Sequence, residues 1–150
     1  MLEVEGRHSY EIRGIPFTGV IDLVMEDEKG IYIVDHKSRD LKPRSKRKKP
    51  TLQDEELDDM LRQLYLYSAA VYDKYGKHPY KVCFNCFRVG RLIEEQFNPA
   101  AYESALEWAI NSINEIMDNT DGFSPYLDYF ACHNICELSD ECCYFDMQWA

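Results

Sequence analysis

The distribution of apolar and polar positions predicts strands in the first third of the chain. Short apolar runs cover Tyr10–Arg13, Phe17–Met25 and Ile31–Asp35, and turn-forming residues separate them at Gly14–Pro16 and Asp27–Gly30. The middle run is almost continuously apolar, whereas a half-exposed strand alternates with period two. This run therefore predicts a central strand with both faces covered.

Helical periodicity follows. Apolar residues recur at spacings of three and four over Leu52–Tyr75, and Gly76 is a suitable residue to end that helix. Two further strands are predicted at Tyr80–Val89 and Leu92–Phe97, because Gly90-Arg91 between them is suited to a turn.

A second helix is predicted after these strands. Asn98 is a helix-capping residue, Pro99 suits the first helical position, and the periodicity ends near Asp121-Gly122. The order strand, strand, strand, helix, strand, strand, helix predicts an α/β fold, with a central mixed β-sheet flanked by helices. The remaining residues, 123–150, are rich in aromatic residues and cysteine and show no clear period.

Size and composition predict a globular protein. A chain of 150 residues suits one domain, and 13% aromatic residues is typical of a packed protein and not of a disordered one. No apolar run is long enough to span a bilayer, and no signal peptide is visible, so we expect a soluble, cytoplasmic protein without a membrane partner.

Charge is unevenly distributed. The net charge is −10, yet six of the 17 basic residues fall within eight positions, and acidic residues follow directly. Such a block predicts contact with a phosphate backbone, and the alternative is a solvated loop. The basic residues are Lys42, Arg44, Lys46, Arg47, Lys48 and Lys49.

Two aspartates at the ends of apolar strands are candidates for chemistry. Asp22 and Asp35 each follow a run expected to be buried, where a carboxylate is costly without a partner. Two close carboxylates repel each other unless a cation lies between them, and Mg²⁺ prefers hard oxygen ligands. Lys37 is two residues after Asp35, so both side chains leave the strand on the same side. An ammonium there can position or deprotonate a water molecule and offset charge on a phosphate.

The first predicted helix adds two polar side chains. Gln63 and Tyr67 are four residues apart and share one helix face. Both can hydrogen-bond to a phosphate or orient Lys37, although the pair alone is also typical of an ordinary helix surface.

Together these residues carry a resemblance to a known family. Gly19-Val-Ile-Asp22, then Asp35-His36-Lys37, then Gln63-Leu-Tyr-Leu-Tyr67 resemble the G-x-x-D, D-x-K and Q-x-x-x-Y motifs of RecB-type PD-(D/E)xK nucleases. The resemblance covers roughly residues 14–97. It implies a restriction-endonuclease-like core at residues 8–119, in a single RecB-like nuclease domain over residues 1–150 with a Cys-rich C-terminal tail at 123–150.

The resemblance also implies a role for each matching residue. Asp22, Asp35 and the backbone carbonyl of His36 would bind Mg²⁺ or Mn²⁺, Lys37 would serve the attacking water, and Gln63 and Tyr67 would hold Lys37 or the phosphate. The implied reaction is phosphodiester hydrolysis by a DNA nuclease. The implied substrate is single-stranded DNA or DNA with free ends, as for exonucleases of recombination, repair, CRISPR adaptation and phages. Related nucleases work with helicase, recombination or CRISPR partner proteins.

The sequence departs from the family pattern at its start. The family has a helix before the first strand that carries a metal-facing His or Glu, and this sequence reaches its first strand without one. We expect a truncated, minimal or split nuclease. His8 is the nearby candidate for a replacement ligand, although a surface position is the simpler expectation. The alternative function is a nucleic-acid-binding or assembly module with the same fold and no cutting activity.

The chain has six cysteines, and those in the tail are candidate ligands for a second metal site. Cys132, Cys136, Cys142 and Cys143 crowd the tail in a spacing similar to the C-x-x-C-x5-C of related iron–sulfur nucleases, with one extra residue in the first gap. A [4Fe-4S] cluster, a Zn²⁺ site and unligated or disulfide-bonded cysteines remain the alternatives. Cys83 and Cys86 lie within a predicted strand, so we interpret them as small buried side chains.

Overall fold

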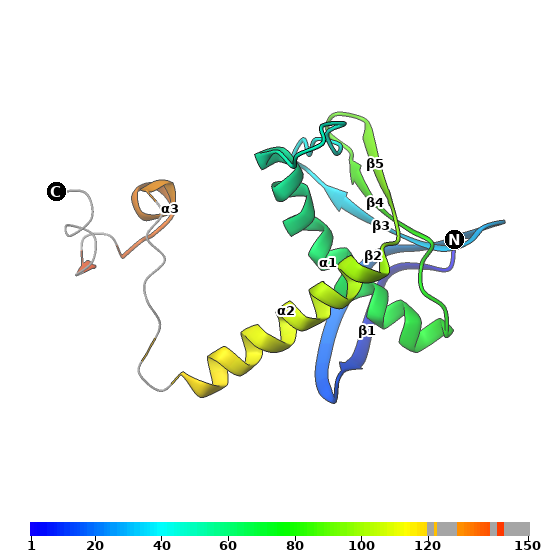
Figure 1. Ribbon diagram of the computed structural model, residues 1–150, viewed down its shortest axis with the longest axis horizontal. Helices are drawn as coiled ribbons and strands as arrows, with labels where there is room; N and C mark the ends of the chain where they lie inside the picture. Colours follow the sequence, from blue (N-terminus) through cyan, green and yellow to red (C-terminus); the bar gives the residue numbers. More distant parts are fainter. Residues whose placement is uncertain (120–121, 123–128, 139–140, 143–150) are drawn as a thin grey trace. The chain divides into compact units, whose positions relative to one another are not determined.

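The computed structural model describes residues 1–119, 122, 129–138 and 141–142 (Figure 1). It divides into two compact units, Met1–Ile113 and Asn114–Ala150, and each is described by itself. All the strands and helix α1 belong to the first unit, and the short helix α3 (Tyr129–Asn134) belongs to the second. That the core and the cysteine-rich tail form one nuclease domain stays a prediction. Within the described residues, no helix combines the length and apolar character needed to cross a membrane.

Five strands form one mixed sheet in the order β1-β2-β3-β4-β5 (Figure 1). Strands β3 and β4 are parallel, and the other neighbours are antiparallel. A parallel pair needs a crossover connection, and α1 lies on it. The predicted α/β fold with a mixed sheet is confirmed. The strands are β1 Glu3–Ile12, β2 Ile15–Asp27, β3 Gly30–Lys37, β4 Lys81–Cys86 and β5 Arg91–Gln96.

Helix α1 (Leu52–Tyr75) has the bounds that the sequence predicted. A capping box starts it, because the Thr51 side chain accepts a hydrogen bond from the Asp54 backbone and the Asp54 side chain accepts one from the Thr51 backbone. Gly76 ends the helix in the left-handed conformation, with φ 67°, and donates its N–H to the Tyr72 carbonyl.

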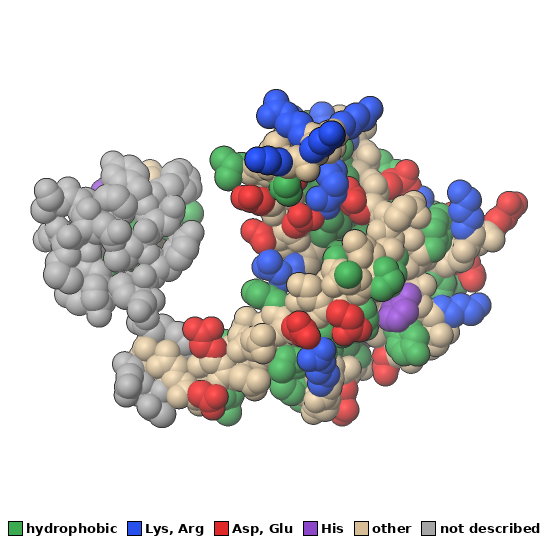
Figure 2. All heavy atoms as spheres, viewed as in Figure 1, with side chains coloured by type: hydrophobic (Ala, Val, Ile, Leu, Met, Phe, Trp, Pro, Cys, Tyr) green, Lys and Arg blue, Asp and Glu red, His purple; other side chains and the backbone are tan. Residues whose placement is uncertain are grey.

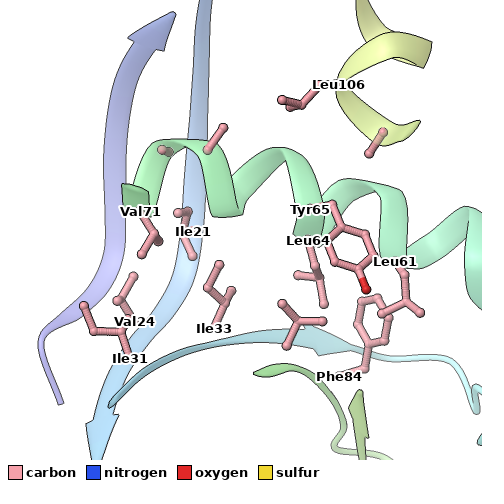
Figure 3. Packing of buried hydrophobic residues seen from close by; sticks show 14 of the residues in the cluster. Ile21, Val24, Ile31, Ile33, Leu61, Leu64, Tyr65, Val71, Phe84 and Leu106 are labelled. Atoms are coloured by element: carbon pink, nitrogen blue, oxygen red, sulfur yellow. The ribbon is translucent and has the colours of Figure 1, made fainter. Parts of the chain in front are cut away.

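The core of the first unit lies between the sheet and α1. Figure 3 shows α1 side chains lying above side chains from β2, β3 and β4, with Leu106 of α2 (Pro99–Asp118) approaching α1 from its other side. This burial stabilises α1 far more than helix propensity alone. The labelled residues are Ile21, Val24, Ile31, Ile33, Leu61, Leu64, Tyr65, Val71, Phe84 and Leu106.

The prediction that both faces of β2 are covered was wrong for the described residues. Strand β2 is interior in the sheet, and Ile21 on the side of α1 is fully buried. Val20 points away from that side and is 47% exposed. The apolar run therefore reflects an interior strand with one well-covered face, because strand position and face coverage need not go together.

Several predicted limits were also wrong. Strand β1 begins at Glu3 and not at Tyr10, because its polar residues pair with the apolar β2 strand as far as Glu3↔Val24. Strand β4 ends at Cys86, where the carbonyl accepts the Val89 N–H and a turn begins. Helix α2 ends at Asp118, short of the predicted Asp121-Gly122. The Asn98 cap is confirmed, since its side chain accepts hydrogen bonds from the two residues after Pro99.

Candidate functional site

The two predicted aspartates lie where strands β2 and β3 separate. Pairing between these strands stops at Leu23↔Val34, and Asp22 and Asp35 are the next residue on each strand. In place of a backbone bond between the strands, Asp22 Oδ2 accepts the His36 N–H at 2.7 Å. The sheet therefore presents a carboxylate from each strand at the point of separation.

Asp35 is a buried carboxylate with an unusual environment. It is 4% exposed. Burial raises the pKa of Asp35, the neighbouring Asp22 charge raises it further, and Lys37 opposes both effects. Lys37 Nζ lies 2.9 Å from Asp35 Oδ2 as an ion pair, yet this buried oxygen receives no well-aligned hydrogen bond from any described residue. An incompletely satisfied, buried carboxylate beside a second one suits a hard divalent cation.

Lys37 connects the aspartates to helix α1. Its side chain is 19% exposed, and Nζ lies 3.1 Å from Gln63 Oε1. Gln63 Nε2 in turn donates to the Tyr67 hydroxyl at 2.8 Å. The hydrogen bonds Lys37–Gln63–Tyr67 hold the ammonium next to Asp35 from the opposite side. The structure thus brings together all five side chains that the sequence selected.

Gly19 and Tyr67 make a contact that the sequence did not predict. A Cβ atom placed at Gly19 would lie 3.1 Å from Tyr67 Cε1, which is closer than most such contacts in proteins. The glycine lets the tyrosine ring rest against the backbone of β2, three residues before Asp22. The joint presence of G-x-x-D on a strand and Q-x-x-x-Y on a helix was the only sequence signal for this contact.

Comparison with protein-family models adds the decisive observation. Residues 1–143 match the model of the PD-(D/E)XK nuclease superfamily. The chain belongs to this superfamily. Its members are generally metal-dependent nucleases that act on DNA and usually use Mg²⁺ or Mn²⁺, and the restriction-endonuclease-like fold matches the mixed sheet described above. A search of curated proteins finds no match.

The Gly19–Tyr67 contact predicts how the candidate site responds to a small substitution. In Gly19→Ala, the tyrosine must move by a few tenths of an ångström, and the Gln63–Lys37 bond moves with it. We expect kcat to fall roughly tenfold, since small displacements in active sites have large kinetic effects. The cleavage rate and the thermal stability of the variant and of the native chain would be measured. Val20→Ala on the opposite face is the control, and an equal loss in both variants would contradict the argument.

His8 was wrongly expected at the surface. It is 6% exposed on β1, opposite Gly19 of β2. Its Nε2 lies 3.1 Å from Glu3 Oε2, and Glu3 also binds Lys74 Nζ at 2.6 Å near the end of α1. The ring is therefore directed along β1 toward Glu3. A strand with period-two burial at positions 8, 10 and 12 could have indicated this.

The six basic residues at positions 42–49 fall into two groups. Lys42 pairs with Asp40, and Arg44 contacts Asp58 at 2.6 Å and Glu95 at 3.3 Å. Within the part of the chain that the structure describes, the other four make no ion pair and are exposed: Lys46, Arg47, Lys48 and Lys49. Figure 2 shows Lys and Arg side chains gathered at the end of the unit where the segment between β3 and α1 lies.

Asp54 anchors this basic segment, although the sequence analysis did not select it. Its carboxylate is 3% exposed and accepts hydrogen bonds from the backbone and hydroxyl of both Ser45 and Thr51. These bonds, the Ser45 hydroxyl first, hold the pKa of Asp54 far below its ordinary value of 3.8. The capping-box pattern T-x-x-D was the available signal for this residue.

Asp54 should therefore make stability depend on pH. A lowered carboxyl pKa contributes stability that is present above the unfolded pKa, near 3.8, and is lost as pH falls through the folded pKa. We expect Asp54→Asn to be less stable than the native chain at neutral pH, with the difference shrinking below about pH 4. Urea unfolding across pH measures this. Asp73→Asn, on the exposed face of α1, is the control, and a difference that persists at low pH would refute the assignment.

The structure describes five of the six cysteines. Cys83 and Cys86 are 1% and 0% exposed free thiols, as predicted, and burial raises the pKa of Cys83 to about 11. Cys132 lies in α3, and Cys136 follows it. Cys143 lies outside the described residues. Among the residues that are described, no group of three or more His, Cys, Asp or Glu side chains is placed to hold a metal.

Proposed function

We propose that this PD-(D/E)XK protein is a divalent-metal-dependent DNA nuclease of the RecB-type branch. One observation carries the proposal: the Lys37–Gln63–Tyr67 hydrogen bonds meet Asp35 and Asp22 where β2 and β3 separate. Five side chains from the three motifs thus lie together, although they are up to 45 residues apart in the sequence, from Asp22 to Tyr67. A purely structural role would not require a buried, incompletely bonded carboxylate.

Each of these residues has a proposed part in the reaction. Asp22, Asp35 and the His36 carbonyl would hold Mg²⁺ or Mn²⁺, which supplies a Lewis acid for the phosphoryl oxygen. Two carboxylates suffice for Mg²⁺, because it usually keeps several waters. Lys37 would orient the attacking water and offset negative charge on the phosphate, and Gln63 would hold the ammonium in place.

The basic segment supports a strand of DNA as the substrate. Strand β3 carries Asp35 and Lys37, and the chain runs from its end directly into this segment. The four exposed cations, Lys46 to Lys49 with Arg47 among them, would bind phosphates of a strand leaving the site. Lys42 and Arg44 were proposed for the same role, but their carboxylate partners compete with phosphate.

We further propose exonuclease action on single-stranded DNA or on DNA ends, with a helicase, recombination or CRISPR protein as partner. End-labelled linear strands, circular strands and blunt duplexes would be incubated with Mn²⁺, Mg²⁺ or EDTA. Metal-dependent shortening of linear strands, with circles intact, is the expected result. Cutting of circular strands would show that the protein is an endonuclease and not an exonuclease.

The competing function is a DNA-binding module that does not cut. It is favoured by the absence, among the described residues, of a third His, Cys, Asp or Glu side chain grouped with Asp22 and Asp35. This candidate predicts salt-sensitive DNA binding that persists in EDTA, with no products in any metal.

A [4Fe-4S] cluster on Cys132, Cys136, Cys142 and Cys143 remains part of the proposal, with Zn²⁺ as its alternative. Anaerobically purified protein would be measured by visible absorbance together with iron, sulfide and zinc analysis. A broad band near the violet with stoichiometric iron supports the cluster, whereas zinc without colour supports the alternative.

A further inference from the structure

A groove next to the candidate site has walls suited to a flat ring. It is lined by the β1–β2 hairpin, α1 and α2, and has a volume of about 350 Å³, at the lower end of the range for small-molecule sites. Gln63 and Tyr67 form part of its wall, so the groove adjoins the hydrogen bonds that hold Lys37. We call it the aromatic groove. All its residues belong to the first unit.

Trp108 of α2 is the residue of the aromatic groove that indicates most directly which ligand it binds. Its ring is 47% exposed, although tryptophan in a domain of this size is usually well buried. The Arg62 guanidinium lies 4.6 Å from the ring centroid, and Asp59 holds that guanidinium with a contact of 2.9 Å. A guanidinium over a half-exposed indole ring offers surfaces of the kind on which unpaired bases stack.

The other wall is also aromatic. Tyr10 and Phe17 stack at 5.9 Å with an interplanar angle of 27°, and the Tyr67 ring rests against Gly19 beside them. Gln63 and Thr18 also line the groove. A wholly apolar partner side chain would cover the Thr18 hydroxyl without offering it a hydrogen bond, whereas a nucleobase has an apolar face and polar edges.

The charges around the aromatic groove differ from those around the proposed phosphate site. The Asp59 carboxylate lines the groove and would repel a phosphate, while Lys37 and the exposed cations after β3 would attract one. The base and the phosphate of one nucleotide would thus be recognised by different, adjacent surfaces. Bases stacked inside a duplex could not enter.

We propose that the aromatic groove binds an unpaired nucleobase of the strand whose phosphate lies at Asp22, Asp35 and Lys37. This inference rests on the proposed function for the position of the phosphate. It gives the enzyme a preference for single-stranded DNA that depends on base stacking on Trp108 and Arg62.

Trp108 fluorescence provides the test. The chain has two tryptophans, so in a Trp149→Phe background the indole emission comes from Trp108 alone. In EDTA, this protein would be titrated with oligothymidylate and with an abasic strand of equal length and charge. We expect quenching by the strand with bases and little by the abasic strand. Equal quenching by both, or no binding of either, would overturn the proposal.

Affinities of variants give a second readout. Trp108→Ala should weaken binding of oligothymidylate roughly 5- to 150-fold, the effect of losing one base-stacking aromatic, and leave abasic-strand binding almost unchanged. Tyr72→Ala is the matched control, because Tyr72 is a 50% exposed aromatic residue outside the groove. Equal losses for both strands would contradict the proposal.

Nuclease activity is scored separately in the same preparations. A chain that cuts DNA but does not distinguish the two strands retains the proposed function and lacks the base site. A chain that distinguishes them but never cuts retains the base site and loses the nuclease assignment.

Discussion

Asp35→Asn is expected to abolish cleavage and, at the same time, to leave the fold at least as stable as before. Loss of the proposed metal-binding carboxylate would remove several kcal/mol of transition-state stabilisation, so the rate should fall by at least about a thousandfold. The amide has the same shape as the carboxylate, and Gln63 Oε1 still receives the Lys37 ammonium. The substitution therefore removes the negative charge of residue 35 and keeps the packing around its side chain.

The stability half of this prediction follows from burial. The Asp35 side chain is 6% exposed and lies near the Asp22 charge, so its ionised form is unfavourable in the folded chain without a metal. We expect Asp35→Asn to raise the free energy of unfolding in EDTA by roughly 0.5–2 kcal/mol, as for many substitutions that relieve a functional site. Asp73→Asn, on exposed helix surface, should change neither quantity.

Metal binding supplies an independent measurement. Mg²⁺ or Mn²⁺ should raise the Tm of the native chain, because a ligand that binds only the folded state stabilises it. The same addition should leave the Tm of Asp35→Asn unchanged. If the variant cuts at the native rate, or gains the same Tm increase, the metal lies elsewhere.

The sequence predicted the fold well where all the signals for a helix or strand lie within that same element. The bounds of α1 were predictable because its periodicity, its Thr51 start and its Gly76 end all agree. Strand β1 was partly missed, because Glu3 and its polar neighbours look solvated until the pairing with β2 is known. The exposed face of β2 was missed for a related reason: apolar residues show that a strand is interior but not what covers it.

The candidate site was predictable as a set of residues but not as a geometry. Spacing placed Lys37 beside Asp35 and Gln63 beside Tyr67, since these pairs share one strand or one helix. The separation of β2 and β3 before Asp22, and the Tyr67 ring against Gly19, depend on contacts between elements. The groove at Trp108 is of the same kind, because it is formed by residues of four different elements that come together only in the fold.

Lys37→Met is expected to lower kcat by roughly 10²- to 10⁴-fold, the range typical of a lost acid–base or charge-stabilising group. Methionine keeps most of the side-chain volume that packs near the Phe84 ring, 5.7 Å from Nζ, and removes only the ammonium. Lys81→Met is the matched control: Lys81 is 17% exposed, on the adjacent strand β4, and pairs with Glu94. Its loss should not alter the cleavage rate by more than about twofold.

Lys37→Arg separates two roles of the ammonium. Arginine keeps the positive charge but does not release a proton, and its planar group does not fit the Gln63 contact as an ammonium does. If Lys37 mainly stabilises phosphate charge, Lys37→Arg should keep more activity than Lys37→Met. If proton transfer dominates, the two variants should be equally slow at every pH tested.

The stability of these variants shows whether Lys37 and Asp35 act as a pair. Removing Lys37 leaves the buried Asp35 carboxylate without its ion-pair partner at 2.9 Å, so Lys37→Met should destabilise the chain by roughly 1–3 kcal/mol. Adding Asp35→Asn removes the uncompensated charge and should restore most of that stability, while activity stays absent. Since Asp35→Asn alone is expected to add roughly 0.5–2 kcal/mol, a gain no larger than this in the Lys37→Met background would contradict the pairing, because independent residues show equal gains in both backgrounds.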